Sequence, residues 1–133
     1  MIQCQMLLGN SSETEEVVAL YFSAHWCPPC RRFTPLLKKF HSELGGEFEV
    51  VFVSWDKSEA AMLQYLKQAH GDWYYIAFDS PTRDSLRKDF GVRGIPSLII
   101  IKPNGDVISS DARKEVQKVK PAEALAAWKE ANN

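Results

Sequence analysis

Three short apolar runs along the chain predict the strands of a sheet. Residues 17–23 (VVALYFS), 48–55 (FEVVFVSW) and 97–101 (SLIII) are rich in β-branched and aromatic side chains. Each run is too short for a helix, and its apolar positions are nearly continuous, which is typical of strands covered on both faces. We therefore expect these runs to form central, buried strands.

Helical spacing occupies the segments between and after these runs. Within residues 29–44 the apolar side chains recur at intervals of three and four, and two glycines follow as a C-terminal stop. Residues 56–71 predict a second helix, in which Asp56 caps the N-terminus and Glu59 stands where a capping box places its acid. The remaining predicted elements are a short helix at 82–91, a hairpin turn at 104–106 and a last helix at 121–132.

The order of these elements predicts an α/β fold. Strand, helix, strand and helix, followed by a strand hairpin and a closing helix, give a sheet with parallel crossovers and one antiparallel edge. The chain has 133 residues, 45% of them hydrophobic, which is enough for one compact core, so we expect a single domain over residues 1–133. Ligands of such sheets gather at the carboxyl ends of the strands.

Charge and hydropathy exclude several classes of partner. The formal net charge is −1 and charged residues make up 25% of the chain, so we expect neither a nucleic acid nor an anionic membrane as partner. The first residues lack the basic stretch and apolar run of a secretory signal, and no run approaches the ~18 apolar residues of a membrane span. We expect a cytoplasmic protein, with a nuclear location also open.

The stretch SAHWCPPCRRFTP, residues 23–35, carries the candidate chemistry. A helix that begins just after Cys27 directs unpaired amides at its sulfur and stabilises the thiolate. Pro28 and Pro29 hold the turn in one shape, whereas Cys30 lies further into the helix and is less accessible. This asymmetry predicts that Cys27 attacks a substrate disulfide and that Cys30 resolves the resulting mixed disulfide.

A zinc site and a structural disulfide are the alternatives to a redox pair. A CxxC pair is half of a four-ligand zinc site, but the sequence has no second CxxC and no close histidine pair. The other candidate ligands are scattered, and we expect them to be ordinary surface or boundary residues: Cys4, His25, His41 and His70. We therefore expect no metal, and a reducing compartment disfavours a structural disulfide.

The segment ALYFSAHWCPPCRRFTPLL resembles the active-site segment of the thioredoxin superfamily. Its WCPPC core with FTP after it is similar to the tryparedoxin and nucleoredoxin branch. The resemblance continues through FEVVFVSWD, FGVRGIPSLIII and NGDVISSDAR and covers residues 15 to 128. It implies a thioredoxin-like fold, with a central mixed β-sheet flanked by helices.

The resemblance also implies roles for residues outside the cysteine pair. Pro96 corresponds to a cis-proline that faces the cysteines, where the backbone of Ile95 would bind an extended substrate strand. Trp26 would shield the sulfurs and offer an apolar contact surface. The supporting residues implied in this branch are Pro28, Pro29, Trp55, Asp56 and Arg113. Asp56 would pair with Arg113 or relay a proton, although helix capping explains it equally well.

The sequence departs from ordinary thioredoxins at one position. The buried acid that they carry six residues before the first cysteine is Tyr21 here, so Cys30 must lose its proton with other help. We expect Tyr21 to be a core residue. We likewise expect Trp73, in an insertion between Cys30 and Pro96, to pack in the core.

These observations predict a thiol-disulfide oxidoreductase that reduces protein or low-molecular-weight disulfides through Cys27 and Cys30. No dinucleotide fingerprint is present, so we expect no bound cofactor and an external source of electrons. The resemblance offers thioredoxin reductase, glutathione or trypanothione as that source. The alternative is a redox-sensitive protein-binding module with little turnover.

Overall fold

A computed structural model describes residues 2–3 and 17–132. Its sheet has the strand order β1-β4-β3-β2-β5-β6. The strands are β1 (Ile2–Gln3), β2 (Val17–Ser23), β3 (Phe48–Ser54), β4 (Tyr74–Tyr75), β5 (Ser97–Ile101) and β6 (Val107–Ser109). The pairs among β1, β4, β3 and β2 are parallel, whereas β5 runs antiparallel to both β2 and β6. The predicted mixed sheet is therefore confirmed.

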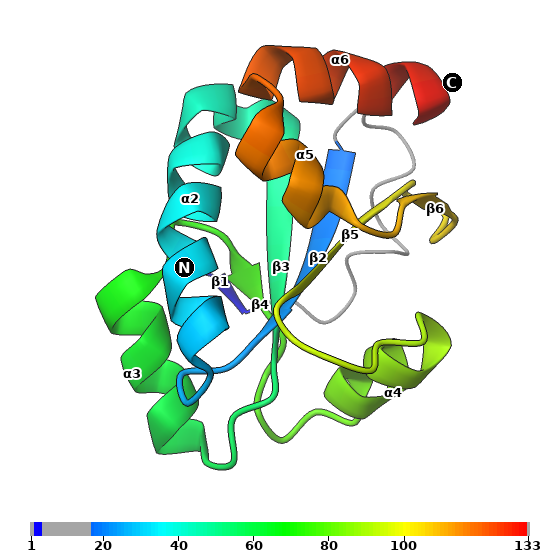
Figure 1. Cartoon of the computed structure of the whole chain (residues 1–133). Helices are drawn as coiled ribbons and strands as arrows, with labels where there is room; N and C mark the ends of the chain where they lie inside the picture. The colour runs from blue at the N-terminus through cyan, green and yellow to red at the C-terminus, as the bar shows by residue number, and fades with distance from the viewer. Residues whose placement is uncertain (1, 4–16, 133) are drawn as a thin grey trace.

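Helices cover both faces of this sheet unequally (Figure 1). They are α2 (Pro28–Leu44), α3 (Glu59–Ala69), α4 (Thr82–Asp89), α5 (Ala112–Lys118) and α6 (Pro121–Asn132), with a 3-10 turn at Gly45–Glu47. Residues of α2, α3, α5 and α6 share one core cluster, whereas α4 packs on the opposite face. None of the described helices is long and apolar enough to cross a membrane.

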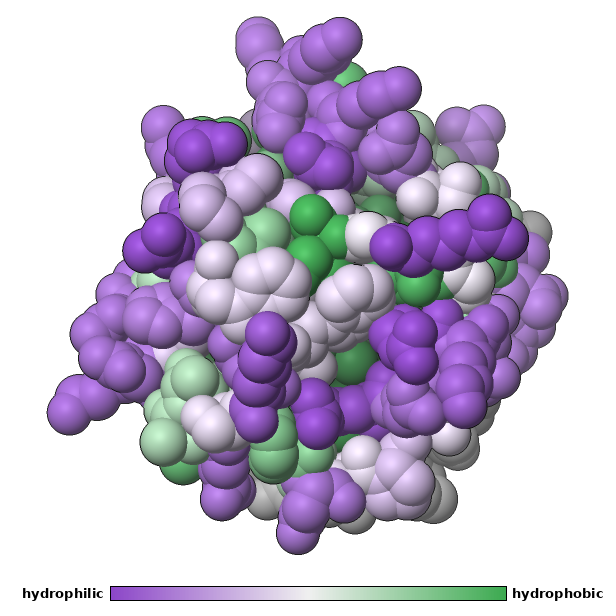
Figure 2. All heavy atoms as spheres, turned by 60° about the horizontal axis from the view of Figure 1, so that its bottom comes forward, coloured by the Kyte–Doolittle hydropathy of each residue, from purple (hydrophilic) through white to green (hydrophobic). Residues whose placement is uncertain are grey.

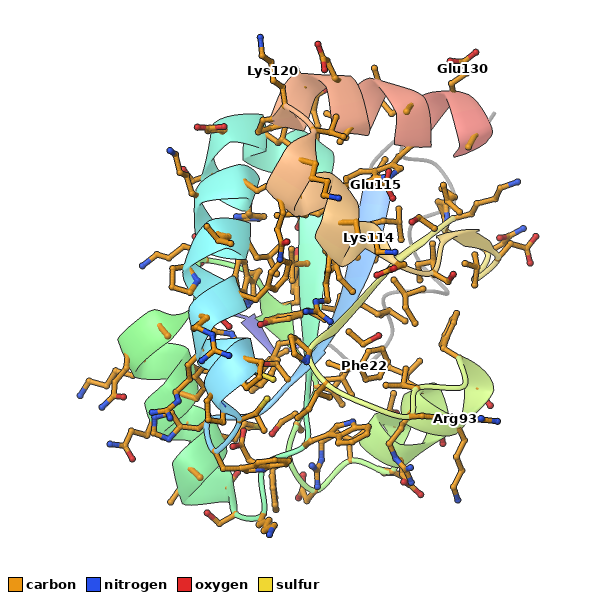
Figure 3. The ribbon with its side chains drawn as sticks, in the orientation of Figure 1. Phe22, Arg93, Lys114, Glu115, Lys120 and Glu130 are labelled. Carbon is orange, nitrogen blue, oxygen red and sulfur yellow. The ribbon has the colours of Figure 1, made fainter. Side chains whose placement is uncertain are left out.

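Two apolar clusters lie on the two faces of the sheet. The larger one is rich in aromatic rings, and Trp128 of α6 stacks on Phe48 with the ring centroids 5.5 Å apart. Trp128 Nε1 also donates to Glu115 Oε2 at 2.8 Å, which fixes α6 against α5. On the other face Phe22 points toward α4, where it belongs to the smaller cluster with Leu86 (Figure 3).

The elements with strong local patterns match their prediction. The strands at 17–23, 48–54 and 97–101 are buried along nearly their whole length. Helix α2 ends at Leu44 and is followed by Gly45 with a φ of 60°, a backbone conformation that favours glycine. The hairpin turn forms as expected, because Lys102 N donates to Asp106 O at 2.8 Å.

Two features of the helices differ from the sequence-based expectation. Asp56 does not cap α3, because Ser58 occupies that position and its Oγ accepts from Ala61 N at 3.1 Å. The sequence also gave no prediction for α5, whose seven residues ARKEVQK contain one residue that the fold buries, Ala112. A helix this short has too little apolar periodicity to be recognised.

Candidate functional site

The two cysteines lie where the chain leaves β2 and enters α2, at the carboxyl end of the parallel strands (Figure 1). Cys27 is the N-cap of α2, and its Sγ accepts a hydrogen bond from Cys30 N at 3.4 Å. Pro28 and Pro29 form the first two helical positions, where they have no amide hydrogen to donate. The helix therefore offers its first free amide, that of Cys30, to the Cys27 sulfur.

The two thiols are free and differ in their surroundings. Cys27 is 5% exposed and its Sγ–H lies 3.9 Å from the carbonyl oxygen of Ile95, whereas Cys30 is 0% exposed. Burial, together with the hydrogen bond that the Cys30 thiol donates to Cys27, raises the pKa of Cys30 to about 12, although the Ser23 hydroxyl opposes this shift. Cys27 is the more accessible sulfur, as the sequence predicted. We call the surface around it, which is bordered by Ile95, Trp26 and Trp55, the opening at Cys27.

The loop before β5 forms one side of this opening. The peptide bond between Ile95 and Pro96 is cis, as the resemblance implied. Ile95 packs against the cysteines, and the groove beside it is lined by Pro96 and Arg113 among other residues. Arg113 Nη1 donates to the carbonyl oxygen of Pro96 at 3.1 Å, and its guanidinium lies over the ring of Phe33. Arg113 therefore supports the loop that faces Cys27.

Two tryptophans also border this opening. Trp26 is 52% exposed, and its Nε1 donates to the carbonyl oxygen of Trp55 at 3.1 Å. Trp55 packs against the cysteines, and Lys57 Nζ lies 5.8 Å from the centre of the Trp26 ring. Seen from this end of the molecule, pale and green side chains gather at the centre and hydrophilic side chains surround them (Figure 2).

The carboxylate of Asp56 has a structural position that the sequence did not predict. It is 4% exposed; Oδ1 accepts from His25 N at 2.8 Å and Oδ2 accepts from Ser54 Oγ at 2.7 Å. No ion pair between Asp56 and Arg113 is present in the described part of the chain, and Ser58 takes the capping role. Asp56 instead ties the loop after β2 to the end of β3.

A group of buried hydroxyls beneath Cys30 escaped the sequence analysis. Tyr21, which occupies the position of the thioredoxin acid, is a core residue as expected, and its Oη lies 2.6 Å from Thr34 Oγ1. The same Thr34 oxygen lies 2.6 Å from Tyr65 Oη, which is 2.7 Å from Ser23 Oγ. The sequence offered one signal for this group: Tyr21 and Ser23 are two residues apart in a strand, so their side chains lie on the same face.

The candidate metal ligands do not converge. Within residues 2–3 and 17–132 no group of three histidine, cysteine or acidic side chains is arranged to hold a metal ion, and Cys4 lies outside those residues. His70 contradicts its expected surface position: it is 6% exposed, and its Nδ1 accepts from Trp73 Nε1 at 3.0 Å. Burial lowers the pKa of His70 to about 3. Trp73 packs in the core, as predicted.

Comparisons with known proteins agree with this geometry. The sequence profile of the thioredoxin-like family matches residues 15–107. Nucleoredoxin of Mus musculus is 42% identical over 113 residues, which cover 82% of this chain and 26% of that protein. This chain thus spans about a quarter of the length of mouse nucleoredoxin.

Solved structures show the same fold. Thioredoxin from Wuchereria bancrofti has a TM-score of 0.77 and 48% identity, covering 94% of this chain and 85% of that one. Tryparedoxin II complexed with glutathionylspermidine has a TM-score of 0.73 and 34% identity, covering 83% of this chain and 78% of that one. The chain belongs to the thioredoxin-like family, in the branch that contains the nucleoredoxins and tryparedoxins.

Proposed function

We propose that this protein reduces disulfides of proteins or small molecules by dithiol exchange. The Cys27 thiolate attacks one sulfur of the substrate disulfide, and the other substrate sulfur leaves and takes up a proton. The Cys30 thiolate then attacks Cys27 Sγ, which forms the Cys27–Cys30 disulfide and releases the second substrate sulfur as a thiol. The substrate gains two electrons and two protons, and the protein loses them.

One observation carries this proposal: two free thiols share one helix N-terminus, and they differ in access. Cys27 sits at an opening bordered by Trp26 and the Ile95 carbonyl, where a substrate disulfide can approach it. Cys30 is 0% exposed, and the sulfur within its reach is Cys27 Sγ, which carries the substrate in the mixed disulfide. A nucleophilic cysteine must be accessible to the substrate, whereas a resolving cysteine needs access only to the nucleophilic sulfur.

Insulin reduction with dithiothreitol tests the proposal against the alternative of a redox-sensitive binding module. We expect multiple turnovers with the wild-type chain and none with Cys27→Ser. Cys30→Ser should stop at a covalent mixed disulfide on Cys27, which non-reducing electrophoresis detects, because no neighbouring sulfur can displace the substrate. Negligible wild-type turnover, combined with partner binding that depends on the oxidation state, would favour the module.

The disulfide formed in each cycle must be reduced by an external thiol or reductase, and charge at the opening favours an anionic thiol. Lys57 lies over Trp26, and Arg113 holds the Pro96 loop. Asp56 is buried and both of its oxygens accept hydrogen bonds, and Asp111, in the groove beside Pro96, is paired with Lys114. Glutathione therefore fits this opening better than the polyamine conjugate glutathionylspermidine that tryparedoxin II holds.

The rates at which the two thiols reduce the oxidised protein test this preference. We expect glutathione to react faster than glutathionylspermidine at equal concentration, with an advantage that shrinks as salt rises, since salt screens charges at an exposed site. A faster reaction with glutathionylspermidine would show that the opening does not favour an anionic thiol.

A further inference from the structure

Four buried hydroxyl groups connect Cys30 to the interior of the protein. They come from three elements: Tyr21 and Ser23 of β2, Thr34 of α2 and Tyr65 of α3. Successive oxygens from Ser23 through Tyr65 and Thr34 to Tyr21 lie 2.7, 2.6 and 2.6 Å apart. All four side chains are 0% exposed, so each hydroxyl must find its partners inside this group or on the backbone.

The number of hydrogen atoms fixes the direction of these bonds. Thr34 Oγ1 donates its single hydrogen to the carbonyl oxygen of Cys30 at 2.9 Å. It must therefore accept from both tyrosines, and Tyr65, having used its hydrogen, must accept from Ser23. In this direction the hydrogen of Ser23 is used on Tyr65, so Ser23 has none to donate to the Cys30 sulfur.

Ionisation of Cys30 calls for the opposite direction. A thiolate is an acceptor, so Ser23 must turn its hydrogen toward the sulfur, and this hydrogen bond lowers the pKa of Cys30. Tyr65 can then donate to Ser23, and Thr34 to Tyr65, while Tyr21 continues to donate to Thr34. The Cys30 carbonyl loses the Thr34 hydrogen in this arrangement, since the single hydrogen of Tyr21 stays on Thr34 at 2.6 Å and the carbonyl lies 3.5 Å from Tyr21 Oη. Rotation of three hydroxyls reverses the chain without moving a heavy atom.

We propose that Ser23, Tyr65, Thr34 and Tyr21 act as one reversible hydrogen-bond chain that stabilises the Cys30 thiolate while it attacks Cys27. Tyr65 is the positioning residue that couples the two halves of the chain. This inference rests on the proposed dithiol exchange and assigns the help that Cys30 receives in place of a buried acid. The proton that Cys30 loses passes to the substrate sulfur that leaves, so the chain supplies hydrogen bonds and takes up no proton.

The tyrosines are poor bases here. Burial raises the pKa of Tyr21 far above its ordinary value and also raises that of Tyr65, so both hydroxyls stay protonated. Two histidines face Tyr65: the His25 ring centroid lies 5.5 Å from that of Tyr65, and the His70 ring centroid lies 4.3 Å from it. Burial keeps His70 neutral near pH 7, and Cys27 is the other titratable group beside Cys30.

A two-step reaction with dithiobis(nitrobenzoate) separates the attack by Cys27 from the resolution by Cys30, in a Cys4→Ser background that removes the third cysteine of the chain. Each step releases one equivalent of the coloured thiol, and stopped-flow absorbance follows both. In Tyr65→Phe we expect the second phase to slow about threefold near neutral pH and its pH profile to move upward by about half a unit, because one link of the chain is lost. The first phase should keep its rate.

Tyr75→Phe is the matched control, since Tyr75 is a half-buried tyrosine of β4 outside the chain of hydroxyls. We expect both phases to match wild type in this variant. A folded Tyr65→Phe variant whose second phase keeps the wild-type rate and pH profile would overturn the inference. Slowing of both phases by the same factor would also overturn it, since it would indicate a general structural effect.

Ser23→Ala provides a second test, because Ser23 is the hydrogen-bond partner of Tyr65 in the chain. It removes the hydroxyl beside the sulfur and should slow the second phase at least as much as Tyr65→Phe, about tenfold. A normal second phase in folded Ser23→Ala would equally contradict the chain, whether or not Tyr65→Phe folds. Cys30→Ser should release a single equivalent of the coloured thiol. If the wild-type pair also released a single equivalent, the proposed dithiol exchange would be wrong, which is a different result from a failure of the hydroxyl chain.

Discussion

Cys27 and Cys30 lie one helical turn apart, yet they belong to two different regions of the protein. Cys27 faces an opening formed by Trp26, Trp55 and the Ile95 loop, and its hydrogen-bond partners are backbone groups. Cys30 is 0% exposed, and the Ser23 hydroxyl, which lowers the pKa of Cys30, is the first member of the hydroxyl chain. The difference shows that a three-residue spacing supplies two sulfurs, while the surrounding segments decide what each sulfur can do.

The two regions also differ in how they stabilise charge. At Cys27 the helix N-terminus supplies a fixed backbone donor, the amide of Cys30, whose direction does not change during the reaction. At Cys30 the donors are side-chain hydroxyls that can rotate, so the same groups serve the neutral thiol and the thiolate. In the dithiol exchange that we propose, the first sulfur has its donor before a substrate arrives, and the second gains its donor after the mixed disulfide has formed.

The largest expected effect concerns access to the two sulfurs. With limiting iodoacetamide and reduced wild-type protein, we expect nearly all of the early label on Cys27, because Cys30 is sealed and its pKa is raised. Cys27→Ser should lose this early label, whereas Cys30→Ser should keep it. Peptide mass spectrometry locates the label, and preferential labelling of Cys30 would reverse the two roles.

The second expected effect is a steep pH dependence of the resolving step. The pKa of Cys30 is about 12, so its thiolate fraction grows as pH rises. Between pH 7 and pH 9 the second phase of nitrothiobenzoate release should accelerate about a hundredfold, tenfold per pH unit. Stopped-flow traces across this range measure the effect, with Cys30→Ser as a control that lacks this phase. A plateau within this range would show that Cys30 ionises more easily than its burial implies.

A third effect concerns His70, whose ring centroid lies 4.3 Å from that of Tyr65. Its folded pKa of about 3 lies below the ordinary 6.5, so the neutral form stabilises the fold above pH 6.5 and that stability is lost as pH falls toward 3. His70→Asn keeps an acceptor for Trp73 and should remove a slope of up to about 1.4 kcal/mol per pH unit.

Urea unfolding at several pH values measures the His70 contribution. The wild-type free energy of unfolding should fall from pH 6.5 toward pH 3 more steeply than that of His70→Asn. Equal slopes in the two proteins would show that His70 is already protonated in the native state.

The smallest effect is expected at the rim of the Cys27 opening. Trp26 is 52% exposed, so Trp26→Ala should change the free energy of unfolding by less than about 0.5 kcal/mol. Its apolar surface beside Cys27 should still matter for a protein substrate, with kcat/KM for insulin falling about fivefold. Reduction of dithiobis(nitrobenzoate) should change less, and an equal loss for both substrates would place Trp26 in the chemical step.

The sequence determined the elements whose signals lie within a few neighbouring residues. The apolar run of β2, the periodic pattern of α2 and the turn at 104–106 appear in the structure as predicted. The different positions of Cys27 and Cys30 followed from the start of the helix, because helix geometry places the later residue deeper. The cis bond before Pro96 followed from the resemblance to the thioredoxin superfamily.

Tertiary structure decided the partners of the polar side chains. Asp56 looked equally suited to cap a helix or to pair with Arg113, but packing placed it on the amide of His25, 31 residues earlier in the chain. Ser23 and Tyr65 are 42 residues apart and Thr34 and Tyr65 are 31 apart, so no local pattern links them. A local pattern reports which face of a strand or helix is buried, whereas a hydrogen bond between distant hydroxyls needs the exact spacing that only the packed elements supply.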